Sequence, residues 1–239
     1  MMLSLRDVHK TRGTGQQGYR LVVPHLELLA GRHYALIGPS GCGKSTLLDL
    51  LALVLAPDRA QRFDFSTADG EFDVGGLWRK GDQDRLARLR SRHLGYVLQT
   101  GGLLGYLDVQ TNIALPRKLL GLAEDGSVER LAGQLGIGEQ LRKKPAALSV
   151  GQRQRVSCAR ALAHGPQLVL ADEPTAALDP LNAGRVMNLL LEQAGRQRAC
   201  CVIATHDEAL VRDAGLEILR LACERDAQGG VVATLEARR

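Results

Sequence analysis

The stretch Gly38-Pro-Ser-Gly-Cys-Gly-Lys-Ser-Thr46 decides the fold of this 239-residue chain. It fits the pattern GxxxxGK[ST], in which the backbone N–H groups of a glycine-rich loop surround phosphate oxygens. An apolar run at 34–37 precedes the loop and another at 46–55 follows it, which predicts a strand before the loop and a helix after it. Because the positive end of such a helix also attracts anions, the whole stretch is predicted to hold a nucleotide phosphate: Gly38, Pro39, Ser40, Gly41, Cys42, Gly43, Lys44, Ser45 and Thr46.

Lys44 and Ser45 supply the charge and the metal ligand of this loop. The Lys44 ammonium is suited to neutralise the β- and γ-phosphates. Mg²⁺ keeps most of its own waters and needs only one or two protein oxygens, one of which the Ser45 hydroxyl offers. The loop therefore predicts binding of ATP together with Mg²⁺.

The apolar run 168–171 ends in two adjacent carboxylates, Asp172 and Glu173. Taken alone, such a pair also fits a structural cap on the following turn. A phosphate loop in the same chain favours the catalytic interpretation, in which Asp172 holds Mg²⁺ through its water shell and Glu173 orients and deprotonates the attacking water. The pair predicts that ATP is hydrolysed.

The segment Leu148-Ser-Val-Gly-Gln152 resembles the LSGGQ signature of the ABC ATPases, with Val150 where glycine is usual. Ser149 and Gln152 also fit a capping box, so plain helix capping is the alternative. In the ABC family, Ser149, the Gly151 backbone and Gln152 correspond to a group that faces ATP held by the opposite subunit. The resemblance implies a homodimer with composite ATP sites. Because a β-branched residue resists conformations open to glycine, Val150 is expected to slow turnover or weaken closure.

Three further residues occur in the order of the family's motifs. Gln99, after the apolar run 94–98, matches the Q-loop glutamine that touches Mg²⁺. Asp179, in the segment 176–179, matches the D-loop, although with Pro180 it also fits an ordinary helix start. His206, after the run 200–204, matches the switch histidine that contacts the γ-phosphate.

Arg12 stands where the family usually has an aromatic residue that stacks on adenine, about 25 positions before the phosphate loop. A guanidinium can also stack on a base. Tyr19 is the alternative candidate for this contact.

Four of these residues each follow an apolar run of strand length: Gly38, Gln99, Asp172 and His206. Ligands of open α/β sheets bind at the carboxyl ends of the strands, so one sheet edge is predicted to form the site. Outer strands are expected at 3–8 with 21–28 and at 216–221 with 230–235, and the interval 101–163 reads as mostly helical.

The expected fold is α/β, a P-loop NTPase with a RecA-like mixed sheet core, N-terminal antiparallel strands and an inserted helical subdomain, as in ABC ATPases. The resemblance runs from Leu3 to about Leu221. We expect a single domain over 1–239, with its core at about 1–99 and 164–239 and its helical subdomain at about 100–163.

Composition limits the possible partners. A net charge of +5 could indicate nucleic acid, but the densest basic run, 85–93, fits a solvated helix face, and 3% aromatic content is low for stacking on single strands. No nucleic acid partner is expected. The sequence also lacks the roughly 20 apolar residues of a membrane helix and the layout of a signal peptide, and its five cysteines are predicted to be reduced core thiols.

The segment 94–116 resembles small bacterial ABC ATPases that serve lipoprotein release, macrolide efflux and cell division. That resemblance implies a separate integral membrane permease and a location on the cytoplasmic face of the inner membrane. The region 101–122 is expected to receive the permease, or only to pack the subdomain. The alternative function is an ATP-dependent signalling or scaffold component of an envelope machine, without transport.

Overall fold

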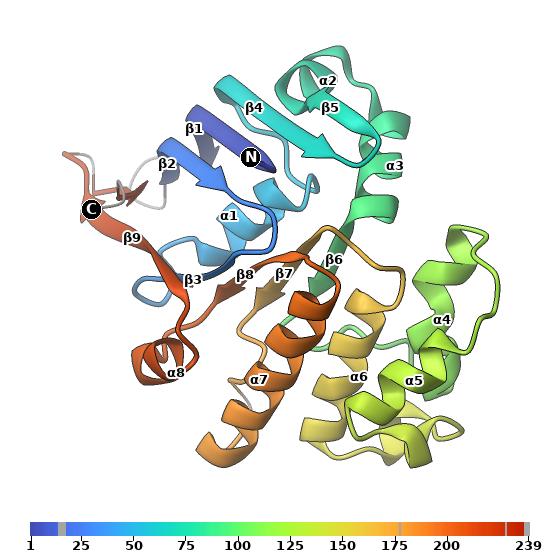
Figure 1. Cartoon of the computed structure of the whole chain (residues 1–239). Helices are drawn as coiled ribbons and strands as arrows, with labels where there is room; N and C mark the ends of the chain where they lie inside the picture. The colour runs from blue at the N-terminus through green and yellow to red at the C-terminus, as the bar shows by residue number, and fades with distance from the viewer. Residues whose placement is uncertain (14–17, 177, 228, 237–239) are drawn as a thin grey trace.

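A computed structural model describes residues 1–13, 18–176, 178–227 and 229–236 of the chain. Ala177, within the predicted D-loop segment, and the end of the predicted domain at 237–239 lie outside the described residues. The described strands form one sheet in the order β5-β4-β1-β2-β10-β9-β3-β8-β7-β6 (Figure 1). It is mixed, as predicted, with a parallel part and an antiparallel part.

The parallel part runs from β9 to β6 and carries the predicted site edge. Each neighbouring pair is parallel, and the strands span β9 (Glu217–Arg225), β3 (His33–Ile37), β8 (Cys200–Ala204), β7 (Leu168–Asp172) and β6 (Leu94–Val97). Residues 34–37, 168–171 and 200–204 are all buried. Burial on both faces explains why these strands read as continuous apolar runs, without the alternation of a half-exposed strand.

The antiparallel part of the sheet is formed mainly by strands from the N-terminal third of the chain. β1 (Leu3–Arg12) pairs with β2 (Tyr19–Leu28) on one side and with β4 (Arg59–Thr67) on the other, and β4 continues into β5 (Gly70–Asp73). The β4–β5 hairpin was absent from the sequence expectations because only Phe63 and Phe65 of β4 are fully buried among arginines and acids. β10 (Val231–Leu235) pairs with both β2 and β9 and so joins the two parts.

Helix α1 (Lys44–Leu51) lies between the antiparallel part and one face of the parallel part (Figure 1). The expected helix at 46–55 is wrong at its C-terminal end. The chain turns at Leu53, which has a φ of 56° and whose carbonyl accepts a hydrogen bond from Arg90 at 2.7 Å. The N–H groups of Val54 and Leu55 both donate to the Asp49 carbonyl, which closes the helix.

Four of the described helices cover the other face of the parallel part. Three of them precede β7 in the sequence and one follows it. α7 (Pro180–Arg196) packs on β8 and α6 (Val150–Leu162) packs on β6, while α4 (Val109–Leu119) and α5 (Ser127–Gln134) pack against α6 (Figure 1). These helices bury a second apolar cluster that includes the alternate residues of β3, β7 and β8. The helices between 101 and 163 thus occupy the interval predicted for the helical subdomain.

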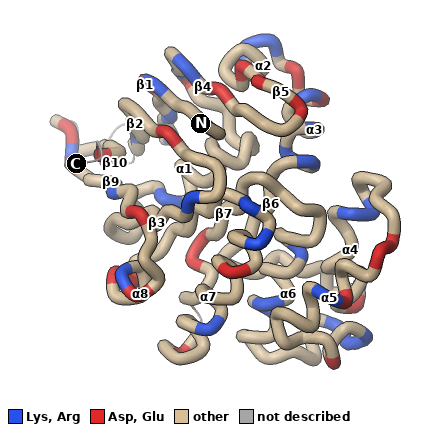
Figure 2. Tube along the Cα trace, viewed as in Figure 1, with Lys and Arg blue, Asp and Glu red and all other residues tan. Residues whose placement is uncertain are grey.

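The remaining helices are α2 (Val74–Lys80), α3 (Gln83–His93) and α8 (Glu208–Asp213), with 3-10 turns at Gly138–Gln140 and Pro145–Ala147. α3 buries Leu86 and Leu89 and exposes Arg85 and Arg88, which is the solvated face expected of the basic run. Figure 2 shows basic and acidic residues interspersed over the trace. Among the helices that the structure describes, none combines the length and apolar character needed to cross a membrane.

Candidate functional site

The loop 38–46 connects the end of β3 to the start of α1 and is shaped by its glycines. A Cβ at Gly38 would lie 2.7 Å from the Cys42 sulfur and 2.9 Å from the Leu221 carbonyl oxygen, so only glycine fits between them. Gly41 and Gly43 have φ angles of 76° and 89°, in the left-handed region. Since α1 has no side-chain cap, the N–H groups at its start are open to an anion.

Tyr19 packs directly on this loop. A Cβ at Gly43 would lie 1.5 Å from the Tyr19 hydroxyl oxygen, and that hydroxyl donates to the Cys42 carbonyl at 3.2 Å. Burial raises the pKa of Tyr19, with the Cys42 and Cys223 thiols adding to the effect. The Tyr19 hydroxyl therefore forms its hydrogen bond with the loop backbone.

Arg12 faces Tyr19 across the β1–β2 pairing and is more accessible. Its guanidinium lies 3.8 Å from an Asp49 carboxylate oxygen, and half of its side chain (51%) is exposed. The structure thus brings both candidates for the base contact close to the loop, and it leaves Arg12 as the one with a free face.

Lys44, Glu173 and His206 form a chain of polar side chains beside the loop. The Lys44 ammonium donates to the Gly38 and Pro39 carbonyls at 2.9 and 3.2 Å and lies 3.9 Å from one Glu173 oxygen. The other Glu173 oxygen lies 2.9 Å from His206 Nδ1. The His206 side chain is 68% exposed and that of Glu173 14%, so the carboxylate is mostly shielded from solvent.

Glu173 has an unusual backbone for a residue with a side chain. Its φ of 47° lies in the left-handed region, at a cost of order 1–3 kcal/mol that is tolerated mainly at functional positions. Its N–H still donates to the Ala204 carbonyl of β8 at 3.0 Å. The hydrogen bonding to β8 therefore extends one residue beyond the end of β7, and the Glu173 carboxylate lies 3.9 Å from the Lys44 ammonium.

The predicted magnesium ligands lie at the same sheet edge. Asp172 is the last residue of β7, Ser45 is the second residue of α1 and is exposed, and Gln99 is exposed two residues beyond β6. All three offer oxygen donors, the ligand type that Mg²⁺ prefers.

Tyr96 and Asp49 stand behind this edge and were missed by the sequence reasoning. The Tyr96 hydroxyl donates to an Asp49 carboxylate oxygen at 3.1 Å. Burial raises the pKa of Tyr96, and the Asp49 and Asp172 carboxylates add to the rise. No sequence signal could have found this pair, since the two residues are 47 positions apart and belong to no motif.

The signature segment begins α6 with the predicted capping box. The Ser149 hydroxyl accepts from the Gln152 N–H at 3.2 Å, and the Gln152 side-chain oxygen accepts from the Ser149 N–H at 2.9 Å. Ser149 is exposed and the Val150 side chain is 43% exposed. Within the described ranges, no hydrogen bond or ion pair joins 149–152 to the loop 38–46.

Asp179 caps the N-terminus of α7. Its carboxylate accepts from the Asn182 N–H at 3.1 Å and from the Asn182 side-chain amide at 2.6 Å, and these bonds lower the pKa of Asp179. A Cβ on Gly151 would lie 3.5 Å from Leu178, so the predicted D-loop and signature are adjacent.

The chain is similar in sequence to known proteins of one family. Residues 23–176 match the family model described as ABC transporter. The chain is 39% identical to the lipoprotein-releasing system ATP-binding protein LolD of Legionella pneumophila, over 77% of this chain and 79% of that protein. It is 38% identical to the macrolide export ATP-binding/permease protein MacB of Marinobacter nauticus, over 91% of this chain and 33% of that protein. The chain thus spans about a third of the length of the macrolide-export relatives.

A solved structure shares the fold almost throughout. A dimeric ATP-binding cassette, MJ0796, in a post-hydrolysis state with ADP and Pi, matches with a TM-score of 0.79 and 29% identity over 96% of each chain. The family match, the curated relatives and this fold lead to one conclusion: the chain belongs to the ABC transporter family and is an ATP-binding ATPase cassette of that family.

Proposed function

We propose that two copies of this chain close around ATP, with the loop 38–46 of one copy facing the signature 149–152 of the other, and that this motion drives a separate membrane permease. The observation that carries the proposal is that the exposed signature makes no hydrogen bond or ion pair with the phosphate loop within the described residues of one chain, although both have groups suited to phosphate. The matched MJ0796 structures are dimeric, which supports a partner copy of the same kind.

The chain Lys44–Glu173–His206 carries the chemistry. Lys44 turns from the loop carbonyls to the β- and γ-phosphates, since the ammonium has the stronger partner there. Glu173 then orients the attacking water and takes its proton, a role suited to a carboxylate that is mostly shielded from solvent. His206 holds the second Glu173 oxygen and, being exposed, reaches the γ-phosphate.

Ser45, Gln99 and Asp172 are proposed to hold Mg²⁺. When bound, the metal neutralises phosphate charge as it develops. The three side chains offer hydroxyl, amide and carboxylate oxygens at one edge, in keeping with a metal that retains several waters.

An apolar groove beside the helical subdomain supports docking of a permease. It measures about 230 Å³ and is lined mainly by Leu94, Tyr96, Leu115, Pro116 and Leu119 from β6 and α4, with His164, two residues beyond α6, at its side. Leu119 is 76% exposed, which leaves a large apolar side chain for a partner. This site lies partly outside the expected 101–122 region, because β6 and α6 supply one wall. The chain would then sit at the cytoplasmic face of the membrane through that partner.

Glu173→Gln tests the composite site. We expect hydrolysis to fall at least about 100-fold while ATP binding persists, since the amide cannot take a proton. The variant should run as a dimer on size-exclusion chromatography with ATP and Mg²⁺, and as a monomer without them.

Glu192→Gln is the matched control, because Glu192 is an exposed carboxylate on α7 paired with Arg196, away from the loop. It should hydrolyse ATP like the unmodified chain. A Glu173→Gln protein that stays monomeric with ATP would exclude the two-copy site.

A further inference from the structure

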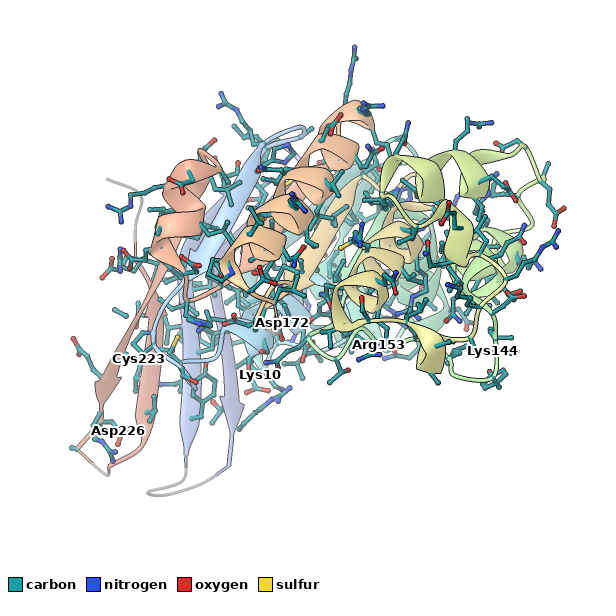
Figure 3. All side chains as sticks on the ribbon, turned by 90° about the horizontal axis from the view of Figure 1, so that it is seen from below. Lys10, Lys144, Arg153, Asp172, Cys223 and Asp226 are labelled. Atoms are coloured by element: carbon teal, nitrogen blue, oxygen red, sulfur yellow. The ribbon has the colours of Figure 1, made fainter. Side chains whose placement is uncertain are left out.

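Two cysteines that are far apart in sequence meet at the phosphate loop. Cys42 lies between Gly41 and Gly43, and Cys223 lies on β9, next to β10 in the sheet (Figure 3). The Cys223 sulfur is 3.8 Å from the Cys42 carbonyl oxygen. Burial raises the pKa of Cys223 to about 11, and the Cys42 thiol adds to the rise by its proximity and by a side-chain hydrogen bond. The two thiols are therefore direct neighbours.

The Cys42 side chain is turned back toward β9. Its sulfur packs against Gly38, where a Cβ would come within 2.7 Å of it, and the same Cβ would lie 2.9 Å from the Leu221 carbonyl of β9. The Cys42 carbonyl receives both the Tyr19 hydroxyl and the Cys223 thiol. Three segments, from β2, the loop and β9, thus converge on one residue of the loop.

A cavity gives reagents access to this pair. It holds about 240 Å³ and is lined by loop residues 39–42 and by Cys223, Glu224, Arg225 and Val231. Cys42 is 2% exposed, whereas Cys223 is half-buried. The other three cysteines, Cys158, Cys200 and Cys201, lie in the core with at most 1% exposure and line none of this cavity.

We propose that Cys42 and Cys223 are a thiol modification site that low-molecular-weight disulfides oxidise to an intramolecular disulfide, which ties the phosphate loop to β9. The more exposed Cys223 thiolate attacks one sulfur of the reagent and releases one reagent thiol, forming a mixed disulfide. The Cys42 thiolate attacks the Cys223 sulfur and releases the second reagent thiol. The reagent disulfide gains the two electrons, and the two protons from the protein thiols end on the released thiols or in water.

The tie hinders nucleotide binding, a consequence that rests on the proposed function. A disulfide holds its two sulfurs at about 2.05 Å, so it fixes the position of the Cys42 side chain relative to β9. The loop has to adjust as Lys44 leaves the Gly38 and Pro39 carbonyls for the phosphates. A covalent link at Cys42 opposes that adjustment, and we expect oxidation to weaken ATP binding at least about tenfold.

The experiment uses the full chain with oxidised glutathione as the probe. Peptide mapping without reduction should find a 42–223 linked peptide, formed faster as pH rises because a thiolate is required. ATP affinity, measured by titration with Mg²⁺, should fall on oxidation and return after dithiothreitol. Cys223→Ser is the matched control: its ATP affinity should not change with the same reagent.

The outcomes separate the two proposals, because the peptide map needs no nucleotide. A map without the 42–223 link overturns the modification site. A link that leaves ATP affinity unchanged overturns its control over the loop. Failure of the reduced chain to bind ATP would count against the proposed function alone.

Discussion

Replacing Gly43 with alanine should destabilise the protein far more than the same change at Gly41, two residues earlier in the loop. Both glycines have left-handed φ angles, 89° and 76°, so each alanine bears a conformational cost of about 1–2 kcal/mol. The surroundings differ. A Cβ at Gly41 meets nothing within 4 Å, whereas a Cβ at Gly43 would lie 1.5 Å from the Tyr19 hydroxyl oxygen and 2.3 Å from the ring carbon that bears it.

The magnitude follows from what Tyr19 must do to make room. Displacing its ring overpacks the site at about 1–3 kcal/mol. Loss of its hydrogen bond to the Cys42 carbonyl adds about 1 kcal/mol. Gly43→Ala should therefore be less stable than Gly41→Ala by about 2–4 kcal/mol, which at roughly 2–4 °C per kcal/mol is a difference of at least about 4 °C in Tm.

Thermal unfolding of the ligand-free proteins by circular dichroism measures this difference without reference to activity. Tyr19→Ala is the third variant, because it removes the ring that Gly43→Ala would strike. In the double variant that combines Tyr19→Ala with Gly43→Ala, the Gly43→Ala change should lower the stability no more than Gly41→Ala lowers it alone. The two positions should therefore be coupled by about 2 kcal/mol or more. Equal Tm values for the two single alanine variants would refute the packing of Tyr19 on Gly43.

Two other predictions concern pH and the nucleotide base. Burial lowers the pKa of His164 below its ordinary value of 6.5, and its Nδ1 is buried with no described hydrogen-bond partner. Its neutral form therefore stabilises the fold above about pH 6.5. This contribution to stability is lost as the pH falls toward the folded pKa. His164→Asn should flatten the decline of Tm between about pH 7 and 5, and an unchanged slope would assign the decline to other groups. Arg12→Tyr should tighten ATP binding several-fold by isothermal titration if residue 12 faces adenine, since a ring stacks on the base more broadly than a guanidinium. Unchanged affinity would exclude that contact for residue 12.

Much of the fold could be predicted because its signals are local. The runs at 34–37, 168–171 and 200–204 became strands within one residue of their expected bounds, since strands buried on both faces need continuous apolar sequence. The capping box at Ser149 and the cap at Asp179 also formed as expected, because each involves residues three apart. The roles of these residues toward ATP stay predictions.

Other features could not be predicted because they depend on distant packing. The helix after the loop ended at Leu51, and beyond it Leu53 takes a left-handed φ and accepts a hydrogen bond from Arg90, far along the chain. The hairpin of β4 and β5 carried too few apolar residues to be recognised, and it formed by pairing with β1. Cys42 and Cys223 read as separate core thiols until β9 brought them together.

The sequence by itself determined the glycine-rich loop, the order of the candidate site residues and their places at strand ends, because motif spacing and buried strands are properties of short segments. Tertiary structure alone decided what surrounds the loop: Tyr19 over Gly43, Glu173 between Lys44 and His206, and Cys223 behind Cys42. These contacts depend on the order and register of β2, β7, β8 and β9 in the sheet. The residue pattern within one segment does not determine that order and register.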